Sequence, residues 1–284
     1  SCFWHMLFDT HCHIQFKSLY NDLNEVIVRC SEKNMILNLV GTQIPTSEKA
    51  IALAEQYEWM YASIGIHPIQ HDVVEVEEEA SHFTTRGEEW NQELFERLAQ
   101  HPKVIAIGET GLDKFHIRGD KDIEEIFAAQ KTLFLQHYEL AQTYHKPLVI
   151  HVRDAHEEMI KILESLPHPI QGTVHCFTGN WSHAERYLSF GLHLGFTGVI
   201  TFPPKKTDPA PQEALLDVIK KMPLTRMLVE TDAPYLAPQA YRGERSEPWM
   251  VEECIKKIAE IRGVSVESIA DITTENAKKL FLPT

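Results

Sequence analysis

The chain has 284 residues, of which 43% are hydrophobic and 24% are charged, as in an ordinary globular protein with a sizeable core. Its formal net charge of -14 argues against a broad DNA-coating surface, because such a surface needs an excess of Lys and Arg. The charge still permits a small site in which metal ions contact a few phosphates. No apolar run approaches the roughly 18 residues that a membrane-spanning helix needs, so we expect no membrane partner.

The five cysteines are scattered and odd in number, and they form neither a disulfide framework nor a CxxC zinc pattern. We interpret them as reduced thiols of a cytoplasmic protein. The start of the chain lacks the basic segment and the long apolar core of a secretory signal. We expect residues 1–5 to be an extension added before a native initiator at Met6, and residues 6–284 to form one domain.

From Met6 onward, short apolar runs rich in Val, Ile and Leu alternate with segments of helical spacing. The predicted strands are 7–10, 36–40, 61–66, 104–107, 148–150, 172–174, 193–196 and 227–229. The predicted helices are 22–34, 46–57, 91–101, 122–145, 155–166, 182–190, 210–221 and 248–262. Continuous apolar strands that alternate with amphipathic helices indicate parallel strands buried on both faces.

Eight such units in about 250 residues match a closed (β/α)8 barrel better than an open sheet. A doubly wound open sheet is the alternative. The first predicted strand is not followed by the GxGxxG turn of the dinucleotide-binding form of that fold, which makes the alternative weaker.

Side chains able to bind metal follow the carboxyl ends of several predicted strands. They are Asp9, His11, His13, His67, Glu109, His151, His175, Glu230 and Asp232. In a closed parallel barrel these ends converge on one face, where barrel enzymes place their chemistry. We therefore expect residues that are far apart in the sequence to form one cluster.

The first strand supplies a pair of histidines. Side chains alternate along a strand, so His11 and His13 project to the same side, about 6–7 Å apart at the backbone. Two imidazoles in this register can bind one divalent ion, and carboxylates of Glu109 and Asp232 can complete its shell.

A second ion can lie between His151 and His175, which end adjacent strands, with Glu109 bridging the two ions. Two metals about 3.5–4 Å apart stabilise both the attacking and the leaving oxygen of a displacement at phosphorus. Mixed imidazole and carboxylate ligands suit Mg, Mn or Zn better than a metal that prefers sulfur.

Each of these residues also has an ordinary structural explanation. A single histidine after a strand is usually hydrogen-bonded and structural, and HxH often arises by chance. We interpret the remaining histidines of this kind as surface residues: His82, His101, His116, His137, His145, His156 and His183. Cys12 and Cys176 flank expected ligands but point the other way, so we interpret both as small core residues. The joint pattern over five strand ends is what favours a metal site.

These residues lie in segments that resemble the TatD-type deoxyribonucleases. The segments are Phe8–His13, Gly65–Pro68, Gly108–Asp113, Ile150–Ala155, His175–Gly179 and Glu230–Leu236, with Tyr241–Gly243, Glu247–Pro248 and Thr274–Ala277 as C-terminal signatures. They occur in the family's order and extend almost from end to end of the chain. One departure follows Asp113, where many relatives carry consecutive aromatic residues and this chain has Lys114, Phe115 and His116.

The resemblance implies a TIM barrel of the metallo-dependent hydrolase type that acts as a 3′–5′ exonuclease on DNA ends or single strands. It implies two divalent ions, and as their ligands His11, His13, Glu109, His151, His175 and Asp232. The resemblance assigns the catalytic roles to Asp232 and Glu109, and Asp232 accepts a proton from the attacking water. A carboxylate in that position is also a ready general base on chemical grounds.

His67, Arg153 and Arg242 are candidates for binding substrate phosphate. The forked donors of arginine match phosphate geometry, although either arginine can equally be an ordinary ion-pair partner.

Two further functions remain open. One is hydrolysis of another ester or amide, such as D-aminoacyl-tRNA, although Glu109 stands where many amidases of the wider superfamily use a carboxylated lysine. The other is a metal-binding barrel without turnover, against which the complete ligand set argues. We expect a monomer or a weak homo-oligomer.

Overall fold

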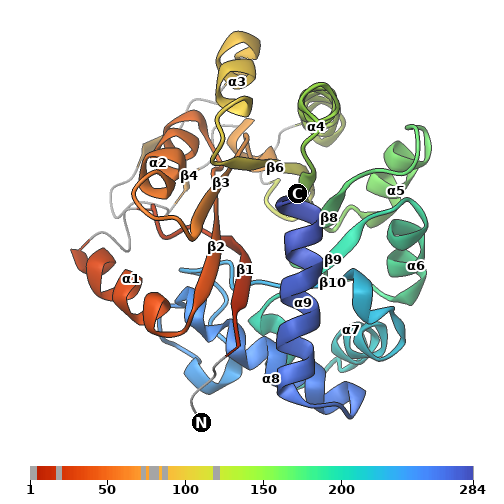
Figure 1. The fold of residues 1–284 in the computed structure, drawn as a ribbon. Helices are drawn as coiled ribbons and strands as arrows, with labels where there is room; N and C mark the ends of the chain where they lie inside the picture. Colours follow the sequence, from red (N-terminus) through yellow and green to blue (C-terminus); the bar gives the residue numbers. More distant parts are fainter. Residues whose placement is uncertain are drawn as a thin grey trace.

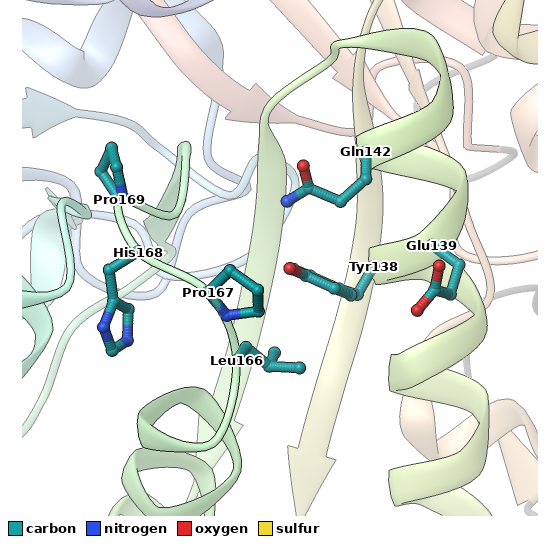
Figure 2. Close-up of a pocket in the computed structure, with 7 residues that line it drawn as sticks. All are labelled: Tyr138, Glu139, Gln142, Leu166, Pro167, His168 and Pro169. Atoms are coloured by element: carbon teal, nitrogen blue, oxygen red, sulfur yellow. The ribbon is translucent and has the colours of Figure 1, made fainter.

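The structure is a computed structural model that describes residues 5–16, 21–71, 75–76, 83–84, 89–117 and 122–283. Its main sheet contains β1 (Leu7–Cys12), β2 (Met35–Val40), β3 (Met60–Ile64), β6 (Val104–Asp113), β7 (Leu148–Arg153), β8 (Gly172–Val174), β9 (His193–Phe196) and β10 (Met227–Val229). These eight strands pair in parallel and follow one another around the sheet in chain order. That order confirms the predicted (β/α)8 barrel, and it contains no switch point of the kind that a doubly wound sheet needs (Figure 1).

Backbone hydrogen bonds beyond the end of β10 link the last strand to the first. Asp232 N donates to His11 O at 2.8 Å, and His13 N donates to Ala233 O at 2.7 Å. The segment after β10 therefore lies beside the end of β1, and it brings Asp232 next to the histidine pair.

Helices surround the barrel in the positions that the hydrophobic spacing predicts. They are α1 (Leu23–Glu32), α2 (Ile44–Ala54), α3 (Gln92–Ala99), α4 (Ile123–Tyr144), α5 (His156–Glu164), α6 (Trp181–Ser189), α7 (Ala210–Lys221) and α8 (Val251–Arg262). Local signals fix several ends. The side chain of Asp122 accepts hydrogen bonds from the first turn of α4, and α8 ends at Gly263, whose φ of 64° favours glycine.

The helix α9 (Val266–Phe281) is absent from the sequence prediction. It begins at Ser265, whose side chain accepts from Ser268 N at 3.1 Å, and its buried residues recur at helical spacing. In Figure 1 it crosses the middle of the barrel. The rings of Phe281 and Phe8 lie 6.1 Å apart. The cluster around Phe281 contains the second residue of five strands: Phe8, Ile36, Ile105, Val149 and Leu228. The helix thus covers the end of the barrel where the strands begin.

The remaining elements are short. A small antiparallel pair contains β4 (Glu75–Val76) and β5 (Phe83–Thr84). The 3-10 helices are η2 (Pro68–His71), η3 (Gly198–Thr201), η4 (Leu224–Arg226), η5 (Gln239–Tyr241) and η6 (Pro248–Met250). Among the residues described, no helix combines the length and the apolar character needed to cross a membrane.

Candidate metal centre

Four donor atoms converge at the carboxyl end of β1. Nε2 of His11 lies 3.2 Å from Nε2 of His13 and 3.2 Å from Oε2 of Glu109. Oδ1 of Asp232 lies 3.0 Å from Nε2 of His13 and 3.4 Å from Nε2 of His11. The structure therefore brings together the four residues expected around the first ion, although Glu109 lies within the long strand β6 and not after its end.

The spacing and the hydrogen bonds of this group fit a divalent metal. Nδ1 of His13 donates to Val40 O at 2.7 Å, which leaves a lone pair on Nε2 of the neutral ring. Ligands about 2.0–2.1 Å from a tetrahedral zinc lie about 3.3 Å from one another. The separations here range from 3.0 to 3.8 Å. Carboxylate oxygens and an imidazole lone pair that face one another at such distances are stabilised by a cation between them.

A second group of donors faces the other oxygen of Glu109. Its Oε1 lies 3.1 Å from Nδ1 of His151 and 3.4 Å from Nε2 of His175. The rings of His11 and His175 are stacked with centroids 3.5 Å apart, so the two groups are neighbours. Glu109 therefore presents one oxygen to each group, as the expected bridging position requires.

Each of these two histidines donates a hydrogen bond to a buried carboxylate through the ring nitrogen that does not face Glu109. Nδ1 of His175 donates to Oε1 of Glu230 at 2.9 Å, and Nε2 of His151 donates to Oδ2 of Asp113 at 2.8 Å. In each ring the other nitrogen faces Glu109, so when the ring is neutral this nitrogen carries the lone pair that a metal ligand needs. No role is expected for Asp113 from the sequence. Asp113 lies four residues after Glu109 on β6, and residues an even number of positions apart on a strand project to the same side. This spacing could have indicated that Asp113 faces the same group as Glu109.

His67 lies beside Glu109, but its hydrogen bonds differ from those of the other histidines. Burial lowers its pKa, so the ring is neutral, and its Nδ1 accepts from Ile69 N at 3.2 Å. The proton is therefore on Nε2, which faces Oε1 of Glu109 at 3.3 Å. Proximity alone groups His67 with Glu109 and His151 as a possible metal site. The tautomer instead makes it a hydrogen-bond donor to Glu109.

The electrostatics of the cluster favour ionised carboxylates. Burial alone would raise the pKa of Glu109, but the nearby histidines, His11 first, lower it well below its ordinary value. The pKa of Asp232 is also lowered, against the effect of burial. Burial lowers the pKa of His11, which favours its neutral ring. Burial opposes the charged form of His175 too, yet Glu230 and Glu109 raise its pKa to about 10.

Two expectations outside the cluster are wrong. His137 is fully buried, not a surface residue, because Nδ1 donates to Leu133 O and Nε2 accepts from Ile66 N. Cys176 is partly exposed rather than in the core, with Sγ 3.4 Å from Oγ1 of Thr197. Cys12 is buried, as expected. Five other histidines expected at the surface are at least partly exposed, namely His101, His116, His145, His156 and His183, while His82 lies outside the described residues.

The two candidate phosphate-binding arginines are exposed and do not join the cluster. Arg153 ends β7, two residues beyond His151, and Arg242 directly follows η5. Within the described part of the chain, neither forms an ion pair with a carboxylate. The ordinary ion-pair explanation therefore finds no partner there.

A parallel (β/α)8 barrel with histidines and carboxylates gathered at its carboxyl end defines the class of metal-dependent barrel hydrolases. The model of the family described as "TatD related DNase" matches residues 8–282. The chain therefore belongs to the TatD family of metal-dependent hydrolases, which confirms the resemblance seen in the motifs.

Two bacterial relatives match almost the whole chain. The Bacillus subtilis (strain 168) protein named "Uncharacterized metal-dependent hydrolase YabD" is 39% identical, over 97% of this chain and 99% of its own length. The Escherichia coli (strain K12) metal-dependent hydrolase YjjV is 32% identical, over 96% of each chain. The crystal structure of YjjV from Escherichia coli K12, described as a TatD homolog, superposes with a TM-score of 0.79 and 28% identity, covering 97% of both chains.

Proposed function

We propose that the protein is a divalent-metal-dependent deoxyribonuclease that hydrolyses phosphodiester bonds of DNA ends or single strands in the 3′–5′ direction. The observation that carries the proposal is the position of Glu109, whose two oxygens face two separate groups of ligand atoms 3.1 to 3.4 Å away. Two adjacent metal positions that share a carboxylate are the arrangement used for displacement at phosphorus.

In this proposal the first ion would be held by His11, His13, Glu109 and Asp232, and the second by Glu109, His151 and His175. Glu109 thus has a catalytic role because it fixes the two positions relative to each other. When bound, the ions supply positive charge that stabilises the attacking and leaving oxygens of the phosphodiester. Mixed nitrogen and oxygen donors accept Mg, Mn or Zn.

The carboxylate of Asp232 is the general base of the proposed reaction. Its lowered pKa keeps it ionised, and hence able to accept a proton. Its side chain retains 15% exposure, whereas that of Glu109 retains 4%, so Asp232 is the carboxylate that water reaches more readily. In the complex with substrate, the Nε2–H of His67 would donate to a substrate oxygen in place of Oε1 of Glu109.

The test is a hydrolysis assay of labelled single-stranded DNA with Mg, Mn and Zn in turn, with an aminoacyl ester as a parallel substrate. We expect Asp232→Asn to lower kcat by roughly 100-fold or more, which is the usual contribution of a general base. Asp217→Asn is the matched control, because Asp217 pairs with Lys221 on α7. Intact DNA under every ion, together with cleavage of the ester, would replace the nuclease by the ester-hydrolase alternative.

A further inference from the structure

Two arginines at the carboxyl end of the barrel are stacked on aromatic rings. The guanidinium carbon of Arg153 lies 4.2 Å from the ring centroid of Phe115, and that of Arg242 lies 4.1 Å from the ring centroid of Phe202. The other cation–ring contacts among the described residues are longer, between 4.9 and 6.0 Å. Stacking of this kind holds the planar guanidinium in place while its N–H edge remains available.

The Arg153–Phe115 pair lies on the β6–β7 side of the metal cluster. Arg153 points to the same side of β7 as His151, one step further out. Lys114 N donates to Arg153 O at 3.0 Å, which ties the segment carrying Phe115 to this strand.

The Arg242–Phe202 pair lies on the β9–β10 side. Phe202 directly follows η3 and Arg242 directly follows η5. These two helices are joined by a hydrogen bond from Gln239 N to Oγ1 of Thr201, 2.8 Å long. Strand β8, which ends just before His175, stands between the two sides in the sheet. The two pairs therefore flank the metal cluster.

The charges of both arginines are available to a ligand. Arg29 and Arg186 lie 2.7 and 2.8 Å from glutamate oxygens, whereas among the described residues no carboxylate lies within ion-pair distance of Arg153 or Arg242. In a protein of net charge -14, two exposed arginines for which the described residues offer no acidic partner place two positive charges beside the proposed metal site.

Exposed aromatic rings occur beside the same site. Phe115 is 48% exposed and Tyr235 is 39% exposed, and they are the aromatic members of the exposed large hydrophobic residues in the described chain. The ring of Tyr235 lies 6.3 Å from that of His13. Cationic groups interleaved with exposed aromatic faces are typical of surfaces that bind single-stranded nucleic acid, because bases stack on the rings and phosphates bind the charges.

We infer that the two arginine–aromatic pairs bind the nucleotides on either side of the scissile phosphate, and that the ligand is an unpaired DNA strand lying across the mouth of the barrel. This inference rests on the proposed nuclease function and names its substrate-positioning residues. Each guanidinium edge contacts a backbone phosphate. Its outer face, together with Phe115 and Tyr235, offers a stacking surface to bases that a duplex would keep paired.

The inference is tested by fluorescence anisotropy with the metal-loaded full chain and a labelled phosphorothioate strand of roughly ten nucleotides, a length within the usual range of single-strand sites. We expect Arg153→Gln and Arg242→Gln each to weaken binding and to reduce the slope of log K against log salt by about 0.7, and the double variant by about 1.4. Phe115→Leu keeps the charge, so it should weaken binding about tenfold through lost stacking while the salt slope stays the same.

Arg186→Gln is the matched control, because Arg186 lies over the Phe190 ring on the outer helix layer. Unchanged affinity and slope in the double variant, or equal affinity for a blunt duplex of the same length, would overturn the inference. These binding results can be distinguished from a failure of the proposed nuclease function, which is measured by DNA hydrolysis. A wild-type protein that binds the strand with the expected slopes but leaves unmodified DNA intact would refute the nuclease and retain the binding site.

Discussion

Glu230 is fully buried behind His175, and replacing it with glutamine removes its charge while keeping its shape. Its Oε1 accepts hydrogen bonds from Nδ1 of His175 and from Cys176 N, and its Oε2 accepts from Oγ1 of Thr10 at 3.3 Å. The amide oxygen of a glutamine can keep the first two bonds, and its NH2 group can donate to Thr10. We therefore expect Glu230→Gln to fold normally.

The change should instead weaken metal binding. A hydrogen bond to a charged acceptor contributes about 1.5–3 kcal/mol, against about 0.5–1.5 kcal/mol for a neutral one. The difference between the middles of these ranges, about 1.25 kcal/mol, corresponds to a loss of metal affinity of roughly eightfold, near the lower end of the usual effect of residues that support a ligand histidine. Titration of the protein with Mn or Zn against a chromogenic chelator measures this loss directly.

A second buried glutamate provides the control for Glu230→Gln. Glu252 is 6% exposed, and its partner is Lys33 at 3.1 Å, in the outer helix layer. Glu252→Gln should leave metal affinity within about twofold of wild type. If Glu230→Gln also stays within that range while its melting temperature is unchanged, the reasoning about charge support of His175 is refuted.

Three further predictions concern stability. Gly111 has a φ of 155°, and a Cβ there would overlap the carbonyl oxygen of His151, so Gly111→Ala should lower the free energy of unfolding by about 3 kcal/mol, measured by urea denaturation. A chelator should lower the melting temperature by roughly 5 °C relative to protein with metal at 100 times its Kd, as scanning calorimetry can show. Burial lowers the pKa of His137 to about 4 from 6.5, so the unfolded chain takes up the proton first as the pH falls. Stability should therefore drop by about 1.4 kcal/mol per pH unit between 6.5 and 4, and His137→Gln should reduce that slope in denaturation curves collected across this range.

The sequence was sufficient to predict the strands and to place the candidate ligands at one end of the barrel. Parallel strands that follow one another in a closed sheet have their carboxyl ends on one face, so His11 and Asp232 approach each other although 220 positions separate them. The apolar runs that mark these strands depend on burial on both faces, which the alternating helices already indicate.

The supporting contacts could not be predicted in the same way. Whether Asp113 reaches His151 depends on the pairing of β6 with β7, which shifts in register between Ile107 and Thr110. The contact of Glu230 with His175 depends on side-chain orientation across β8, β9 and β10. Such details arise from packing and not from the spacing of residues along one strand.

Other omissions had a signal in the sequence. His137 lies on α4 at helical spacing from the buried residues Leu133, Phe134 and Leu140, which predicts the inner face of the helix. The region of α9 begins with a serine cap, and its apolar residues recur every three or four positions. In α4 and in α9, apolar residues at helical spacing predict a face that packs against the core. Polar residues within these segments made the pattern less evident.

The net charge of -14 opposes DNA binding at the metal site less than the magnitude of the charge implies. At physiological ionic strength the Debye length is about 8 Å, so acidic side chains spread over a surface of 13451 Å² act mainly on their own surroundings. A phosphate at the mouth of the barrel is affected most by the groups within that distance, which in the proposed complex are Arg153, Arg242 and the bound ions. The overall acidity instead discourages contact between DNA and the rest of the surface. If the proposed nuclease function holds, the protein should therefore bind DNA only where a strand reaches the metal centre.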